Sequence, residues 1–128
     1  MKKNIAILGS TGSIGRQALE VVDQFREQFT VEVLTAQNQA DLLINQALRY
    51  MPNAVVIGHE EHYQKVFDAL DSHGIKVYSG EESIRQVVAM ESIQIVLVAL
   101  VGFAGLSPTI EAIKAGKKIA LANKECLV

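Results

Sequence analysis

Three glycines near the start of the chain, each separated from the next by two residues, could help to bind a negatively charged ligand. Gly9, Gly12 and Gly15 form the pattern G-x-x-G-x-x-G directly after an apolar run. Glycine at position 12 lets backbone come close to a pyrophosphate, the free amides of a helix start bind negative charge, and Gly15 lets that helix pack closely on the strand. Ser10, Thr11 and Ser13 supply hydroxyl groups with which phosphate oxygens can form hydrogen bonds. The spacing predicts a phosphate-binding turn, and the alternative is a glycine-rich turn that serves packing alone.

A second polar cluster follows the last apolar run. Asn123, Lys124 and Glu125 come directly after residues 118–122, which are predicted to form a strand. Such a strand would point the cluster into a ligand crevice, whereas the alternative is a helix start with a capping asparagine, a solvated lysine and a dipole-compensating acid. Cys126 comes next. A helix start lowers the pKa of a thiol, so Cys126 could act as a nucleophile. A semialdehyde or acyl-phosphate dehydrogenase is therefore an alternative interpretation. Such enzymes also need a histidine base, and none lies nearby in the sequence.

A third polar group lies at the end of the second predicted strand. In sheets that bind nicotinamide dinucleotides, an acid at this position binds the ribose hydroxyls and repels a 2′-phosphate. Here the polar residues are Thr35, Gln37 and Asn38, which are all neutral. They permit NADP but supply no positive charge for its phosphate. For Gln37 and Asn38 the alternative is an ordinary polar turn before a helix.

Alternating strands and helices would bring these groups together. Apolar runs predict strands at residues 5–8, 29–35, 54–57, 75–78, 95–101 and 118–122. Helical spacing of apolar residues predicts helices between them, which end near Pro52, Gly74 and Gly116. The alternation favours a single α/β domain with a Rossmann-like, doubly wound parallel sheet in three αβα layers. Ligands bind such a sheet at the carboxyl ends of its strands, which is where the polar groups lie.

Three finer features of this fold are predicted as well. The helix after Gly15 has apolar residues at helical spacing, which predict its buried face: Ile14, Ala18, Val21, Val22 and Phe25. Ser79, with Glu82 three residues later, forms a capping box that would begin another helix. Residues 95–101 show no polar alternation, so this strand is expected at the centre of the sheet.

Composition limits the classes of function. The chain has 128 residues, of which 49% are hydrophobic, and a net charge of −2 with acids and bases interspersed. The length suits one domain, and the charge gives no basic surface for nucleic acid or an anionic membrane. No apolar run is long enough to span a membrane, and the single cysteine excludes an internal disulfide. A cytoplasmic location is expected.

Three stretches closely resemble the 1-deoxy-D-xylulose 5-phosphate reductoisomerase family of the non-mevalonate isoprenoid pathway. They are residues 7–15 (ILGSTGSIG), 101–109 (VGFAGLSPT) and 121–125 (LANKE), and the resemblance covers the whole chain. It implies an enzyme that is both oxidoreductase and isomerase, with NADPH and a divalent metal (Mg or Mn) as cofactors. That family converts the phosphorylated ketose to 2-C-methyl-D-erythritol 4-phosphate by a carbon-skeleton rearrangement followed by hydride transfer.

The resemblance also implies roles for particular residues. Thr11, Gly12, Ser13 and Ile14 would line the pyrophosphate site, Asn38 would lie by the adenosine, Asn123 and Glu125 would touch the nicotinamide half, and Lys124 would contact the substrate. The chain departs from the family in two places. It has Ala36 and Gln37 where a glycine and a basic residue are common, and Cys126 where a serine or threonine is common.

In the family, the metal ligands and the lid over the substrate lie downstream of the last motif. We therefore expect residues 1–128 to be a dinucleotide-binding domain, an N-terminal fragment of a longer homodimeric enzyme, and inactive alone. No catalytic residue or metal ligand is assigned within the chain. A non-catalytic dinucleotide-sensing module is the alternative from another class.

Overall fold

The computed structural model describes residues 2–99, 108, 112 and 114–121. Its strands form one six-stranded sheet, in which every pairing is parallel. The strands are β1 (Lys3–Leu8), β2 (Phe29–Ala36), β3 (Ala54–Ile57), β4 (Lys76–Ser79), β5 (Ile95–Val98) and β6 (Lys118–Leu121). Their order across the sheet is β4-β3-β2-β1-β5-β6.

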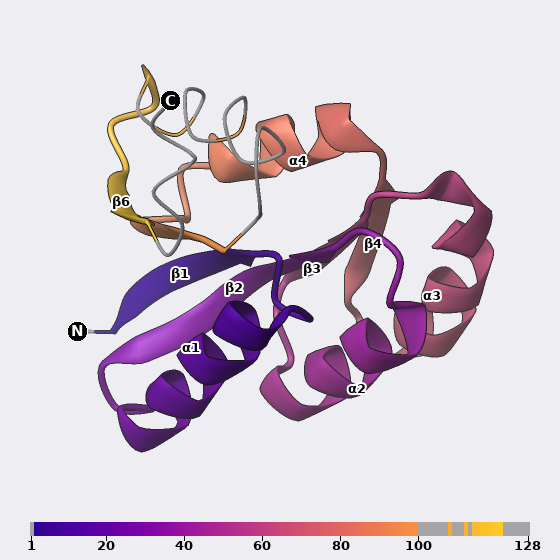
Figure 1. Cartoon of the computed structure of the whole chain (residues 1–128), viewed down its shortest axis with the longest axis horizontal. Coiled ribbons are helices and arrows are strands. Elements are labelled where there is room, and N and C mark those ends of the chain that lie inside the picture. Colours follow the sequence, from indigo (N-terminus) through magenta and orange to yellow (C-terminus); the bar gives the residue numbers. More distant parts are fainter. Residues whose placement is uncertain (1, 100–107, 109–111, 113, 122–128) are drawn as a thin grey trace.

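Helices cover both faces of the sheet. They are α1 (Ser13–Gln24), α2 (Ala40–Tyr50), α3 (Tyr63–Leu70) and α4 (Glu81–Val88), with short 3-10 helices at Glu60–His62 and Asp71–His73. Helices α1, α2 and α3 lie on one side of the sheet and α4 lies on the other (Figure 1). The predicted Rossmann-like, three-layer fold is therefore confirmed. No helix in the described residues is long and apolar enough to cross a membrane.

Burial explains why the central strands form where they do. Residues 5–8 of β1 and all of β3 are buried, as expected for strands of a parallel sheet that are covered on both faces. Alternate residues enter two different apolar clusters. Ile5 and Ile7 pack with α1, α2 and α3, whereas Ala6 and Leu8 pack with α4 and Ala112.

The chain reverses its direction of travel across the sheet at β1. Strands β2, β3 and β4 follow one another on one side of β1, whereas β5 and β6 lie on the other side. Leu8 pairs with Thr35 of β2 and with Val98 of β5, so the three strands end together at one edge. A crevice for a ligand is expected at this reversal.

Two of the finer predictions need correction. The buried residues of α1 are Gly15, Leu19 and Val22, whereas Val21 is 52% exposed and Phe25 is 44% exposed, so only Val22 of the predicted face is buried. The helix has apolar residues on two sides, and their spacing alone does not show which side packs against the sheet. Strand β5 is internal but stands next to the edge strand β6, because β1 and β2 occupy the centre.

The predicted capping box is also wrong. Ser79 is the last residue of β4, and the N-cap of α4 is Gly80, whose φ of 89° is accessible mainly to glycine. No side chain caps α4. Instead, the Ser83 hydroxyl donates a hydrogen bond back to the Ser79 carbonyl at 2.7 Å.

Candidate functional site

The turn between β1 and α1 is built on close backbone contact. Gly9 has a φ of 85°, in the left-handed region. A Cβ atom on Gly15 would lie 2.1 Å from the Gly9 carbonyl oxygen and 2.7 Å from Ser10 Cα. Since no side chain fits there, the predicted role of Gly15 in packing the helix against the turn is confirmed.

Gly12, by contrast, borders open space. It is the N-cap of α1, with a φ of −75° and a ψ of 171°, and a Cβ atom there would have the Gly9 carbonyl oxygen, 3.8 Å away, as its nearest neighbour. The amides of Ser13 and Ile14, in the first helical turn, have no carbonyl acceptor within the helix, and that turn contains no acidic residue. This part of the chain therefore fits a pyrophosphate.

Ser10 does not supply a phosphate donor as predicted. Its side chain is fully buried, and its hydroxyl donates a hydrogen bond to Gln46 Oε1 of α2 at 2.7 Å. Gln46 Nε2 donates in return to the Ser10 carbonyl at 2.9 Å. The prediction for Ser10 is wrong because this hydroxyl ties the turn to α2. The polar residue Gln46 was missed because its position looks like any other in an amphipathic helix.

The other hydroxyl-bearing residues of the turn are better placed. Thr11 is 7% exposed, and no side-chain hydrogen bond joins it to another described residue. Ser13 and Ile14 are exposed in the first turn of α1. Ser13 and Ile14 are therefore exposed beside Gly12, whereas Thr11 is largely buried next to it.

At the end of β2, only one of the predicted polar residues is exposed. Thr35 is buried, and its carbonyl oxygen accepts hydrogen bonds from the amides of Gly9 at 3.1 Å and Ser10 at 2.9 Å. Gln37 lies against Gly58, where an added Cβ atom would come within 2.2 Å of Gln37 Oε1. Asn38 is exposed, two residues after β2 ends. Asn38 is therefore the member of this group that can reach a ligand.

The last predicted group, Asn123, Lys124 and Glu125, lies outside the described residues, as does Cys126. The strand before it is described. Leu121 of β6 pairs with Val98 of β5, which pairs with Leu8 of β1. Strand β6 therefore ends at the same edge of the sheet as β1.

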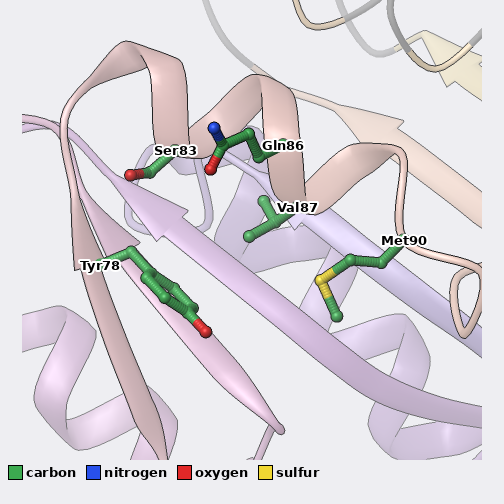
Figure 2. A pocket seen from close by; sticks show the side chains of 5 residues that line it. All are labelled: Tyr78, Ser83, Gln86, Val87 and Met90. Atoms are coloured by element: carbon green, nitrogen blue, oxygen red, sulfur yellow. The ribbon is translucent and has the colours of Figure 1, made fainter.

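A pocket of about 220 Å³ lies elsewhere, between β4 and α4. Figure 2 shows Tyr78 of β4 below the helix that carries the other lining residues, which are Ser83, Gln86 and Val87, with Met90 just beyond it. Among the described residues, no charged side chain and no predicted site residue lines this pocket, and β4 is the edge strand farthest from β6. Among the described residues there is also no group of three or more His, Cys, Asp or Glu that could hold a metal ion.

The parallel sheet, its reversal at β1 and the glycine turn at that point define a Rossmann-like nucleotide-binding domain. A model of the 1-deoxy-D-xylulose 5-phosphate reductoisomerase family matches residues 5–128, so the chain belongs to that family. The resemblance noted in the sequence is thereby confirmed. Membership favours the reductoisomerase over a dehydrogenase with a cysteine nucleophile or a sensing module.

Individual relatives agree in sequence and structure. A 1-deoxy-D-xylulose 5-phosphate reductoisomerase of Phocaeicola vulgatus is 56% identical over 100% of this chain and 34% of its own length. The Zymomonas mobilis enzyme, solved in complex with NADPH, matches with a TM-score of 0.92 and 31% identity over 99% of this chain and 33% of its own. A reductoisomerase in complex with NADPH, fosmidomycin and magnesium gives a TM-score of 0.92 and 33% identity, over 98% and 31%. The present chain thus spans about a third of the length of these relatives.

Proposed function

We propose that this chain is the NADPH-binding domain of an enzyme that converts 1-deoxy-D-xylulose 5-phosphate to 2-C-methyl-D-erythritol 4-phosphate. The observation that carries the proposal is the glycine turn, in which Gly15 closes the helix onto the strand while Gly12 leaves space beside the first amides of α1. Two structural relatives with the same fold were solved with NADPH. Residues 1–128 would be the N-terminal domain, with the remaining parts of the active site elsewhere in the polypeptide.

The pyrophosphate would bind at the turn through backbone amides and small side chains. Thr11, Gly12, Ser13 and Ile14 would line it, and the exposed positions of Gly12, Ser13 and Ile14 support this assignment. The dipole of α1 adds a favourable interaction with the negative charge. Asn38, exposed beyond β2, would hydrogen-bond near the adenosine.

The nicotinamide half of the cofactor and the substrate would lie near the end of β6. Asn123 and Glu125 would contact the nicotinamide half and Lys124 the substrate, as the family resemblance implies. Support comes from the register of β6, which brings its carboxyl end to the edge occupied by the turn after β1. An ammonium group held beside a phosphorylated, oxygen-rich substrate can orient a hydroxyl or stabilise developing negative charge.

A divalent metal, Mg or Mn, would complete the active site of the longer enzyme. Magnesium is present in the complex of one relative. Bound beside the substrate, such an ion polarises the reacting oxygen atoms. Its ligands would lie outside this chain, so the chain alone would bind NADPH without turnover. We further propose that the longer enzyme is a cytoplasmic homodimer.

The cofactor preference of this domain would be modest. With no acid at the end of β2, the 2′-phosphate of NADPH meets no repulsion there. Gln37, which lies against Gly58, is neutral and supplies no positive charge to attract the 2′-phosphate. NADPH should therefore bind more tightly than NADH by only a few-fold.

The test is an assay of the full-length polypeptide with NADPH, 1-deoxy-D-xylulose 5-phosphate and Mg²⁺ or Mn²⁺. Loss of NADPH absorbance that requires both the sugar phosphate and the metal is expected, with 2-C-methyl-D-erythritol 4-phosphate as the product. The present chain, assayed in parallel, should show no turnover. A full-length protein that binds NADPH but leaves it unoxidised with this substrate would overturn the proposal and favour a sensing module.

A further inference from the structure

One flank of α1 is apolar but exposed. Val21 and Phe25, four residues apart and therefore on one side of the helix, are 52% and 44% exposed. Ala18, one turn before Val21, is half-buried. Single exposed apolar side chains are ordinary on protein surfaces, but a row of them along one helix flank is a feature of interaction surfaces.

The charged residues of α1 all occupy the opposite flank. Arg16 lines a groove with residues of α2, and Asp23 accepts hydrogen bonds from Arg49 at 2.7 Å and from Tyr50 at 2.7 Å. Glu20 lies between them, four residues after Arg16 and three before Asp23. The polar residues beside Val21 and Phe25 are the uncharged Gln17 and Gln24. Depletion of charge is typical of the centre of a protein interface.

The apolar flank continues onto the sheet. Because α2 lies beyond β2, the flank of α1 opposite α2 points toward β5 and β6. Ile95 and Leu97 of β5 lie on the same face of the sheet as α1 and are half-buried. Ala120 of β6 pairs with Leu97 and is exposed. We call this surface, made of Ala18, Val21, Phe25, Ile95, Leu97 and Ala120, the β5 flank.

A parallel sheet is normally covered by helices on both faces. On the opposite face, the cluster that includes Val96 and Val98 is covered by α4 and Ala112. On the α1 face, the helices that contribute to the core, within the described residues, are α1, α2 and α3, and the last two pack against β2 and β4. The sheet therefore lacks a covering helix under β5 and β6 in the part of the chain that is described.

We propose that the β5 flank is the docking surface for an amphipathic helix from the rest of the same polypeptide. The relatives are about three times as long as this chain, so they contain the sequence that could supply it. β6, the last described strand, forms one edge of the surface through Ala120, which favours an intramolecular partner. The occupant would present apolar side chains to the β5 flank and an acidic side chain at its edge, where the exposed Lys118 pairs with Ile95 on the same face of the sheet as Ala120.

The experiment uses the full-length polypeptide in a Cys126→Ser background. Val21→Cys places a thiol in the β5 flank at nearly constant volume, and Glu20→Cys is the matched control on the other flank of the same helix. The rate of reaction with a maleimide is measured for each, with the urea-unfolded protein as reference. The Val21→Cys thiol should react at least about tenfold more slowly than the control.

A second measurement identifies the occupant. Phe25 is replaced by p-benzoylphenylalanine in the full-length polypeptide, and the protein is irradiated. Cross-links within one chain, to a residue beyond position 128, would support the proposal. Products of double mass would show a second copy on the surface and overturn it. Equal reaction rates for the Val21→Cys and Glu20→Cys thiols, or the absence of a cross-link to the downstream sequence, would overturn it as well.

Discussion

Gly12 and Gly15 are three residues apart, yet the fold requires glycine only at position 15. At Gly15 the obstacle to a side chain is the protein itself, since the Gly9 carbonyl oxygen lies 2.1 Å from the position of a Cβ atom. At Gly12 the protein leaves room, and φ is −75°, a value that any residue adopts. The fold therefore does not require glycine at position 12, which agrees with the proposed pyrophosphate site.

Substitutions at these two glycines should separate folding from binding. Gly15→Ala should lower the free energy of unfolding by about 3 kcal/mol, because backbone must move to admit the methyl group. Gly12→Val should leave that free energy nearly unchanged while weakening NADPH binding at least about tenfold, or ~1.4 kcal/mol. Urea unfolding and calorimetric titration measure the two effects. A Gly12→Val protein with unchanged NADPH affinity would show that the pyrophosphate binds elsewhere.

A substitution at Lys124 would distinguish a role in catalysis from a role in cofactor binding. If its ammonium contacts the substrate, Lys124→Ala in the full-length enzyme should reduce turnover about a hundredfold, the loss typical of one preorganised charge stabiliser. Affinity for NADPH should change only a few-fold, and in the present chain not measurably. Titrations with NADPH and NADH provide the control. A selective loss of NADPH affinity would instead assign Lys124 to the 2′-phosphate.

At the scale of elements, the sequence predicted the strands better than it predicted helix faces. The strand predicted at residues 54–57 matches β3 because a continuous apolar run has one interpretation in a parallel sheet. On α1, apolar residues occur on two sides, and spacing does not tell the side that meets the sheet from the side that forms the β5 flank. The bond between Ser10 and Gln46 joins residues far apart in sequence, so no local pattern reveals it.

That bond should stabilise the turn after β1 from a distance. Gln46→Ala would leave the buried hydroxyl and carbonyl of Ser10 without these partners, at a cost of about 1–3 kcal/mol in the free energy of unfolding. The adjacent residue Asn45 is exposed, so Asn45→Ala is a matched control that should change this energy by less than about 0.5 kcal/mol. Equal effects of the two substitutions in urea unfolding would contradict the role given to Gln46.

The pair of α1 and α2 should lose stability at high pH through Tyr50. Burial, the hydrogen bond to Asp23 at 2.7 Å and the negative charge of Asp23 raise the pKa of Tyr50 from 10.0 to about 12. Because the folded state holds this proton more tightly, the stabilisation is complete below pH 10 and is lost as pH rises to about 12.

Tyr50→Phe isolates this effect, because other groups titrate equally in both proteins. The stability advantage of the wild type over the variant should be constant below pH 10 and shrink toward pH 12. Urea unfolding across that range measures it. An advantage that stays constant to the end of the range would contradict the raised pKa of Tyr50.

At the scale of the whole molecule, the described residues form a six-stranded sheet, and the proposed active site would lie only partly within this chain. The sheet reverses at β1, and β1, β2, β5 and β6 all end at the edge where the glycine turn lies. This arrangement serves dinucleotide binding, whereas the metal site and the helix over the β5 flank would come from the remaining two-thirds of a protein as long as its relatives. Composition and periodicity predicted the sheet class because that depends on local patterns. Composition and periodicity could not predict which segment covers the β5 flank, because that depends on sequence outside this chain.

The measurement that tests the central claim most directly is calorimetric titration of the present chain with NADPH and, separately, with NADH. The account predicts saturable binding of one NADPH per chain and a weaker affinity for NADH, by a few-fold. Binding of both should be nearly lost in the Gly12→Val variant. Absence of saturable NADPH binding by a chain that unfolds cooperatively would contradict the account.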